Sequence, residues 1–233
     1  MPYRRLPNTD QARLRALKTA QDKGARTGLN DLAFSAKLLF DVEVFVPQFE
    51  QAIRQYQFSK ERQANFGKKL TENFRMARMY LSHFLQVVNM AIARGELKPN
   101  VRTYYGLSEE DKALPEINTE QQLIQWGEKV INGEEERMGQ GGSRVFNPTI
   151  AMVKVHFEKF LDNYHIHKDL VKTSQRMQEK VAQERDTADA LILSIWNEVE
   201  SFFNHLEPEN KRKRSAEYGV VYIFRPSEIA SKS

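Results

Sequence analysis

The amino-acid sequence predicts an all-α fold, a bundle of about six helices built from two related halves. Apolar residues recur every three or four positions over most of the chain, which is the spacing of one face of an α-helix. The sequence also resembles itself after a shift of 112 residues, and self-similarity at a fixed spacing is typical of duplicated units. We therefore expect two repeats, residues 1–112 and 113–233, packed about a pseudo-twofold axis as one globular body.

The internal repeat is clearest at apolar positions. The shift places Phe45 on Phe157 and Phe84 on Trp196. Two flanking motifs also recur: Leu6-Pro7 with Asn8-Thr9-Asp10-Gln11 returns as Leu114-Pro115 with Asn118-Thr119-Glu120-Gln121, and Tyr105-Gly106 returns as Tyr218-Gly219. Because a duplicated unit usually buries its apolar face against its twin, the repeat predicts architecture rather than chemistry.

Each repeat contains two periodic apolar runs. They cover residues 34–56 and 66–92 in the first repeat, and 150–164 and 177–206 in the second. The spacing predicts successive helices or one bent helix pair, so that 34–95 and 146–206 form equivalent helical hairpins. Pro47 lies inside the first run and has no amide N–H, which predicts a kink near Phe45.

Short helices are expected at the start of each repeat, with residues 107–118 as a loop between the repeats. Gly24 and Gly133 are expected to end the short helices. Asn147-Pro148 predicts the start of a long helix, because Asn caps helices and Pro suits the first helical position. Side chains that can cap the short helices stand before their apolar series; they are Asn8 or Thr9, and Asn118 or Thr119.

Two segments are rich in β-branched and aromatic residues rather than in helix formers. They are Val101–Tyr105 and Tyr218–Phe224, which occupy equivalent places at the ends of the two repeats. We expect them to pair as a short two-stranded β-ribbon. A single ribbon is only marginally stable by itself, so it would lie against the helices.

Composition narrows the class of protein. The hydrophobic fraction of 40% and the 14 Phe residues are sufficient for a core, and the absence of Cys excludes disulfides and thiolate chemistry. No apolar run approaches the roughly 20 residues of a membrane span, and no secretory signal is visible, so we expect a soluble, cytoplasmic protein. The 35 basic and 31 acidic residues give a net charge of +4, far from the one-sided charge of a dedicated nucleic-acid binder.

A cluster of potential metal ligands lies in the second repeat. On a helix, Asp162, His165 and Asp169 share one face. Di-metal helical bundles use two Glu-x-x-His pairs and two further carboxylates, whereas this chain offers a single Asp-x-x-His. The equivalent positions of the first repeat carry no such set, so we predict that the cluster holds no metal. Its members are His156, Glu158, Asp162, His165, His167 and Asp169.

Two further patterns are candidates for anion binding. The glycine loops at 24–28 and 139–144 lead into helices, whose N-termini can bind phosphate, but neither loop is a Walker motif. The basic run 211–214 has aromatic neighbours, although such runs are more often solvated loops. Since no complete catalytic set is present, we predict no catalytic residue and no cofactor, and favour a non-enzymatic protein.

Four parts of the sequence contain distinctive short motifs: Arg5–Asp10, Asn118–Glu120 with Trp126-Gly127, Asn147–Ala151 and Glu217–Tyr222. Together they resemble an uncharacterised all-helical protein family of Bacteroidetes-type bacteria. The resemblance spans most of the chain and implies an intracellular bacterial protein. The family has no assigned activity, so the resemblance supplies no catalytic residue.

The sequence therefore favours a helical scaffold or interaction protein that binds a protein partner. A polyanion or nucleic-acid binding module is the alternative, and a metal-dependent enzyme is the second alternative. Partner identity and oligomeric state stay open. If the two β-rich segments pair, they bring together a basic, aromatic binding surface made of Arg102, Tyr104, Arg214, Tyr222 and Arg225.

Overall fold

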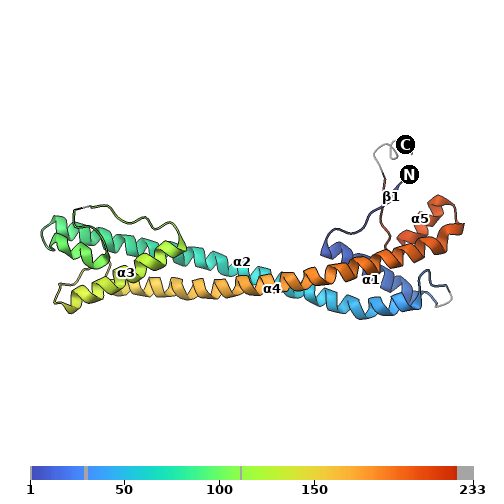
Figure 1. Cartoon of the computed structure of the whole chain (residues 1–233), viewed down its shortest axis with the longest axis horizontal. Coiled ribbons are helices and arrows are strands. Elements are labelled where there is room, and N and C mark those ends of the chain that lie inside the picture. The colour runs from blue at the N-terminus through green and yellow to red at the C-terminus, as the bar shows by residue number, and fades with distance from the viewer. Residues whose placement is uncertain (1, 29–30, 111, 225–233) are drawn as a thin grey trace. The chain divides into compact units, whose positions relative to one another are not determined.

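The computed structural model describes residues 2–28, 31–110 and 112–224 of the chain. Within them, almost all regular structure is helical, as the sequence predicted (Figure 1). The α-helices are α1 (Asp10–Arg26), α2 (Ala36–Ala93), α3 (Glu120–Gly139), α4 (Ile150–Phe202) and α5 (Pro208–Ala216). Two short 3₁₀-helices, η1 (Pro99–Tyr105) and η2 (Phe203–His205), complete the all-α architecture.

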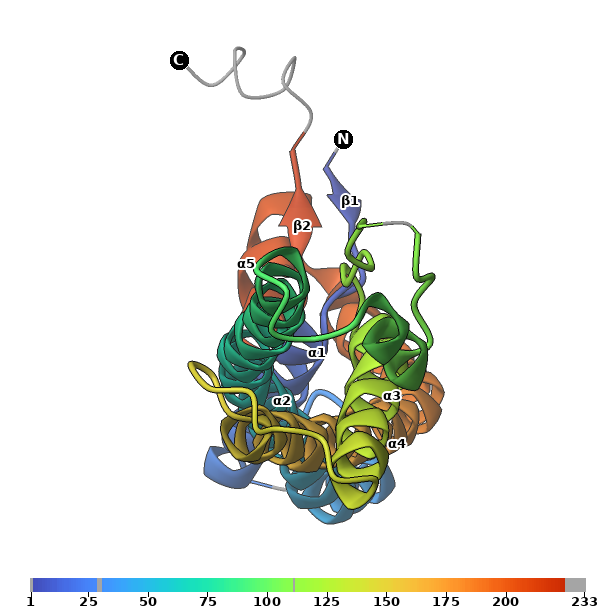
Figure 2. The ribbon, with the colours of Figure 1, turned by 90° about the vertical axis from the view of Figure 1, so that its left-hand side faces the viewer.

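One small sheet joins the two ends of the described chain. Strand β1 (Tyr3–Arg4) pairs antiparallel with β2 (Tyr222–Ile223), with Tyr3 opposite Ile223 (Figure 2). The predicted pairing of Val101–Tyr105 with Tyr218–Phe224 is therefore wrong. Residues 101–105 form part of η1, because Pro99 suits a first helical turn and Gly106, at φ 71°, ends it.

Contacts divide the chain into two compact units. Unit 1 consists of residues 1–60 and 173–233, and unit 2 of residues 61–172. Each unit thus takes one part of α2 and one part of α4. The boundary between the predicted repeats, after residue 112, lies inside unit 2, so the repeats are not the compact units. The internal duplication itself stays a prediction.

Unit 1 has a core formed by α1, the first part of α2 and the last part of α4. Leu17, Phe49 and Trp196 are fully buried there, one from each helix. Tyr218, beyond α5, packs edge-on against Phe34 with ring centroids 6.0 Å apart. Burial of these large side chains is the main stabilising contribution, because apolar area removed from water stabilises a fold at about 25 cal/mol per Å².

Unit 2 has a separate core made by the last part of α2, η1, α3 and the first part of α4. Phe84, Tyr105, Leu123 and Phe160 are fully buried in it. Phe84 and Tyr105 meet edge-on at 6.0 Å, the arrangement that aromatic quadrupoles favour. Figure 2 shows α3 beside α4 in this unit.

The long helices differ from the predicted hairpins. Residues 36–93 form one helix and residues 150–202 another, without a turn in either. The expected break between residues 56 and 66 is wrong because residues 57–65 include good helix formers and neither Gly nor Pro. Pro47 is accommodated inside α2 at an exposed position.

The helix starts were predicted more accurately than the helix ends. Thr9 caps α1, and Thr119 caps α3 in a capping box with Gln122. Gly24 and Gly133, predicted as helix ends, lie inside helices. A Cβ on Gly133 would lie 2.0 Å from the Tyr104 carbonyl oxygen, so this glycine permits close packing instead.

The start of α4 lies slightly beyond the predicted position. Asn147 has φ 59° and precedes the helix, which begins at Ile150. The carbonyl of Thr149 accepts hydrogen bonds from the backbone N–H groups of Met152 and Val153, so Thr149 takes the capping position. Pro148 is buried beside it rather than opening the helix.

Candidate functional site

The predicted basic, aromatic surface is not assembled within either unit. Arg102 and Tyr104 belong to unit 2, whereas Arg214 and Tyr222 belong to unit 1. Arg225 lies outside the described residues. Arg102 is only 3% exposed, so it does not contribute to a binding surface.

Arg102 instead holds the loop between η1 and α3. Its Nε donates to the Ser108 carbonyl at 2.6 Å and its Nη2 to the Ala113 carbonyl at 3.1 Å. Its Nη1 donates to Asn89 Oδ1, and Asn89 in turn donates to the Lys112 carbonyl at 3.2 Å. The guanidinium therefore supplies donors to loop carbonyls that no helix satisfies, which is a structural role.

Unit 2 contains a second buried charged group, centred on Glu134. Arg137 donates from Nε to Glu134 Oε2 and from Nη2 to Oε1, both at 2.7 Å, with side chains 4% and 1% exposed. The Tyr105 hydroxyl donates to Glu134 Oε2 at 2.6 Å, and Arg137 Nη2 also donates to the Ser143 carbonyl at 2.6 Å. We call Tyr105, Glu134 and Arg137 the buried triad.

The buried triad has the geometry of a structural connection. Burial, followed by the hydrogen bond to Glu134, raises the pKa of the Tyr105 hydroxyl well above its usual range, so it stays protonated. The hydrogen bond to Glu134 raises the pKa of Arg137. Both carboxylate oxygens of Glu134 accept hydrogen bonds from neighbours, so the triad joins η1, α3 and the following loop.

The histidine cluster makes mainly packing contacts. His156 stacks on Tyr80 with ring centroids 4.0 Å apart, and His165 lies 5.7 Å from the ring of Tyr164. Among residues 2–28, 31–110 and 112–224, no group of three or more His, Cys, Asp or Glu side chains could hold a metal ion. That the cluster holds no metal stays a prediction.

Unit 2 has a pocket of about 510 Å³ beside the loop between α3 and α4. It is lined by Glu134, by Met138, and by Phe146, whose side chain is 62% exposed. Gly142 in this loop lies directly against Arg137, where a Cβ would not fit. Close packing therefore explains one glycine of the loop 139–144. Two carboxylates line this pocket: Glu134, which belongs to the buried triad, and Glu135, which pairs with Lys154 at 3.0 Å.

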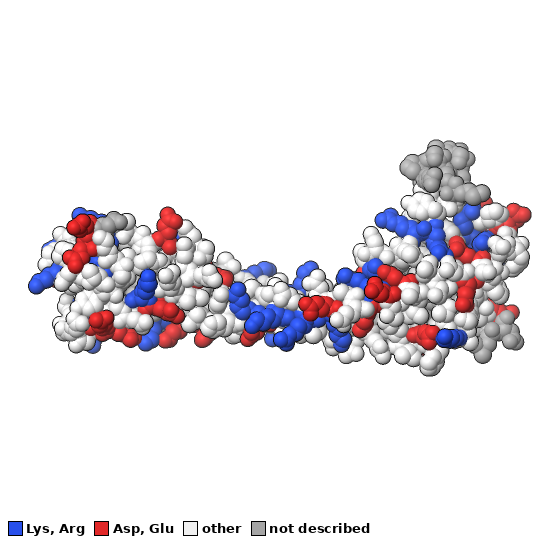
Figure 3. All heavy atoms as spheres, in the orientation of Figure 1, with Lys and Arg blue, Asp and Glu red and all other residues white. Residues whose placement is uncertain are grey.

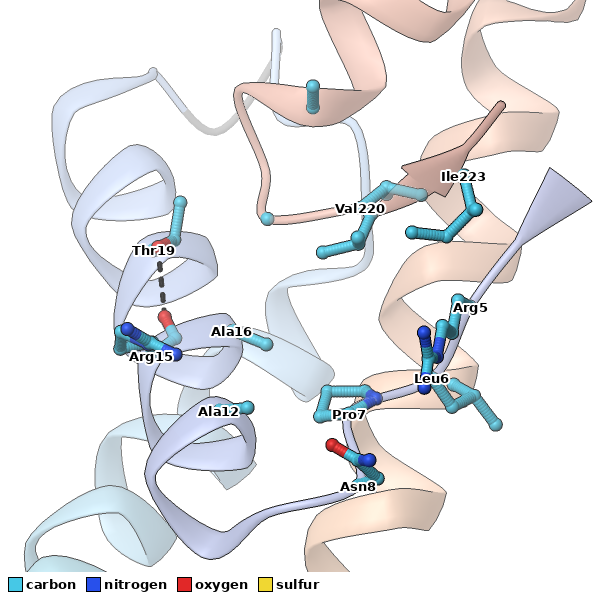
Figure 4. A pocket seen from close by; sticks show the side chains of 13 residues that line it. Arg5, Leu6, Pro7, Asn8, Ala12, Arg15, Ala16, Thr19, Val220 and Ile223 are labelled. Atoms are coloured by element: carbon cyan, nitrogen blue, oxygen red, sulfur yellow. Dashed lines mark hydrogen bonds between the residues drawn. The ribbon is translucent and has the colours of Figure 1, made fainter. Parts of the chain in front are cut away.

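A groove of about 480 Å³ lies in unit 1 between the N-terminal segment (residues 5–8), α1 and the residues that lead into β2 (Figure 4). We call it the unit 1 groove. Figure 4 shows the methyl groups of Ala12 and Ala16 pointing from α1 toward the N-terminal segment. The apolar part of its lining consists of Leu6, Pro7, Ala12, Ala16, Ala216, Val220, Val221 and Ile223.

Polar contacts fasten both walls of the unit 1 groove. Arg4 Nη1 donates to Glu200 Oε2 at 2.9 Å, which ties the N-terminal segment to α4. The backbone N–H of Arg5 donates to the Val221 carbonyl at 3.0 Å and extends the β1–β2 ladder. The Tyr222 hydroxyl donates to Glu200 Oε1 at 2.6 Å, so one carboxylate holds both walls.

Gly219 brings the second wall close to α1. It has φ +88°, and a Cβ built on it would lie 3.0 Å from the Ala16 carbonyl oxygen. Both conditions favour glycine, which explains the Tyr218-Gly219 pair noted in the sequence. The turn after α5 therefore places Val220 at the groove.

Two arginines line the unit 1 groove, Arg5 from the N-terminal segment and Arg15 from α1. Both are exposed. None of the ion pairs among the described residues involves either of them. By contrast, Arg13, on the same helix as Arg15, donates to Asp189 at 2.7 Å.

A second pocket, of about 360 Å³, adjoins β2 and α5. Arg212 and Lys213 of the basic run line it together with Glu209, Tyr222 and Phe224. The run lies on helix α5 rather than on the expected loop, with Arg214 3.6 Å from Glu217. In Figure 3, Lys and Arg side chains gather on the part of unit 1 where the N-terminal segment lies.

Sequence reasoning found Tyr222 and the basic run but missed the groove. In the sequence, Leu6 and Pro7 stand out only as part of a repeated motif. The available signal was the pair of Ala12 and Ala16 four residues apart, which leaves a shallow stripe on α1. The partner wall comes from residues about 200 positions later, which no local pattern indicates.

Comparisons with models of protein families, with curated proteins and with solved structures found no match. Of the helices in the described part of the chain, none combines the length and apolar character needed to cross a membrane.

Proposed function

We propose that this protein is a non-enzymatic helical scaffold that binds a partner protein through the unit 1 groove, in the cytoplasm. The observation that carries this proposal is a groove with an apolar lining and two arginines that have no ion-pair partner among the described residues. Apolar surface combined with arginine is typical of protein-binding sites. Helices and the hydrogen bonds of both walls hold the groove in place, so a partner would bind a preformed surface.

The buried charged groups favour this proposal over an enzyme. Glu134, Arg137 and Arg102 are buried and bound to neighbouring groups within unit 2. A catalytic acid or base must reach a substrate, whereas these side chains connect helices to loops.

A polyanion-binding module is the second candidate function, because Arg212 and Lys213 line the pocket beside the groove. Such binding would weaken steeply as salt is raised, since phosphate contacts release counterions. Retention on heparin that is lost between low and moderate salt, together with weak partner binding, would favour this alternative.

The proposed function can be tested by blocking the unit 1 groove without changing charge. Ala12→Trp would fill the groove, and Ala64→Trp is the matched control on an exposed position of α2 in unit 2. Partners captured from the native host should be lost with Ala12→Trp and kept with Ala64→Trp, while circular dichroism shows equal helix content. Equal capture by both variants would contradict the proposal.

A further inference from the structure

We infer that the occupant of the unit 1 groove is a short segment of a partner protein that carries acidic and apolar side chains. This inference rests on the proposed function and adds the chemistry of the partner. Its three supports are the charge of the groove, the character of the lining, and the apolar side chains that are exposed on its walls.

The charge argument compares the two groove arginines with three paired arginines of unit 1. Arg4, Arg13 and Arg185 each have a carboxylate partner within 2.9 Å. Arg5 and Arg15 face the groove, have no such partner among the described residues, and share their lining with no carboxylate of that part of the chain. An acidic side chain would complete charge-assisted hydrogen bonds that the fold leaves open.

The lining favours a peptide over a nucleic acid. Half-buried Ala12, Pro7 and Ile223 line the groove with apolar groups, and the buried side chains of Ala16 and Val220 lie beneath them. Phosphate and sugar groups gain nothing from apolar contact, whereas leucine-like side chains do, because their transfer from water is favourable. The bases of a nucleic acid would need an aromatic platform, and the groove lining contains no aromatic side chain among the described residues.

Exposed apolar side chains lie on both walls of the groove, and on the N-terminal side they continue past it to Tyr3. Leu6 is 41% exposed and Tyr3 47% exposed on the N-terminal side, and Val221 is 45% exposed on the other side. Neighbouring exposed apolar side chains of this kind mark interaction surfaces. A small carboxylate would leave them uncovered, whereas a protein segment can cover them, which favours a polypeptide occupant.

The test uses the full chain and a fluorescein-labelled peptide of alternating glutamate and leucine, followed by fluorescence anisotropy. We expect binding to the natural sequence, a loss of affinity of about tenfold or more with Arg5→Glu/Arg15→Glu, and weaker binding as salt rises. Arg75→Glu/Arg78→Glu is the matched control, because both residues are exposed on α2 in unit 2. This control should bind as the natural sequence does.

Two comparison probes determine which chemistry is recognised. A glutamate–serine peptide should bind more weakly than the glutamate–leucine peptide, and an oligothymidylate should bind more weakly still. Unchanged affinity after Arg5→Glu/Arg15→Glu, or equal binding of the serine peptide, would overturn the inference. Tighter binding of oligothymidylate would overturn it in favour of a polyanion.

The two proposals fail in different ways. If Ala12→Trp loses its partners but the acidic peptide does not bind, the groove binds a protein and the acidic occupant is wrong. If Ala12→Trp keeps its partners, the proposed function itself is wrong, whatever the peptide does.

Discussion

Unit 2 and unit 1 use their charged residues in opposite ways. In unit 2 the arginine–glutamate pair 137–134 is at most 4% exposed and Arg102 is 3% exposed, and each connects a helix to a loop. In unit 1 the pairs that fasten α1 and the N-terminal segment to α4 are partly exposed, with Arg4 at 24% and Glu200 at 25%. Unit 2 therefore depends on buried charges for its structure, while unit 1 keeps cations accessible at a groove.

Each unit contains one of the two tryptophans, so each can be followed separately. Trp196 reports unit 1 when Trp126 is replaced by Phe, and Trp126 reports unit 2 when Trp196 is replaced by Phe. Urea unfolding monitored in these two backgrounds can assign a change in stability to one unit, which the following predictions require.

The largest expected effect comes from breaking the buried triad. Glu134→Ala leaves Arg137 charged and buried without its carboxylate, which should destabilise unit 2 by about 3–5 kcal/mol. Glu200→Ala in unit 1 removes the partner of both Arg4 and the Tyr222 hydroxyl at a partly exposed site and should cost about 1–2 kcal/mol. Equal losses in urea unfolding would contradict the contrast between buried and exposed pairs.

Truncating the largest core side chains tests whether the two units are comparably packed. Phe84 and Trp196 are each at most 1% exposed, and Phe84→Ala or Trp196→Ala should each cost about 3–5 kcal/mol. Because Trp196→Ala removes a reporter, its effect is measured by circular dichroism. A loss below about 1 kcal/mol at either site would show that one core readily collapses around the cavity.

The sequence predicted those core positions because apolar spacing on a helix records which face is buried. The shift of 112 residues aligns Phe84 with Trp196, and both are buried, but it also places Phe34 on Phe146, of which the first is 4% and the second 62% exposed. The helix starts at Thr9 and Thr119 were predictable because capping is a local interaction.

The remaining features depend on contacts that are distant in sequence. Val101–Tyr105 has β-type residues, yet packing against α3 and the turn at Gly106 give a 3₁₀-helix. Arg102 is buried because loop carbonyls at Ser108 and Ala113 need donors, which composition does not reveal. The unit 1 groove requires residues from both ends of the chain, so no single motif could predict it.

A glycine pair in α3 offers a smaller test of the tight packing in unit 2. A methyl group at Gly133 would collide with the Tyr104 carbonyl, whereas at Gly139 it would meet nothing within 4 Å. Gly133→Ala should destabilise unit 2 by about 1–3 kcal/mol. Gly139→Ala should be neutral or stabilise by at most about 1 kcal/mol, since alanine restricts the unfolded chain. The measurement is thermal unfolding of the two variants. Equal midpoints would contradict the difference in packing between Gly133 and Gly139.

The smallest expected effect concerns Tyr222, which holds one wall of the unit 1 groove. Burial, followed by the hydrogen bond to Glu200, raises the pKa of its hydroxyl to about 12 from 10.0. The folded state thus favours the protonated hydroxyl, so its contribution to stability is complete below pH 10 and is lost as the pH rises through 12. Tyr222→Phe should cost about 0.5–1.5 kcal/mol at neutral pH, because one hydrogen bond is removed.

The pH dependence of the unfolding free energy at alkaline pH distinguishes the Tyr222 hydroxyl from the hydroxyls of the other tyrosines of unit 1. The difference in unfolding free energy between the natural sequence and Tyr222→Phe should shrink between pH 10 and 12, as measured by urea unfolding with Trp196 as reporter. Tyr3→Phe is the control, because Tyr3 is 47% exposed on the opposite strand. A difference that stays constant across this range would mean that the Tyr222 hydroxyl is ionised as readily in the fold as in the unfolded chain, and that its bond to Glu200 does not hold the groove wall.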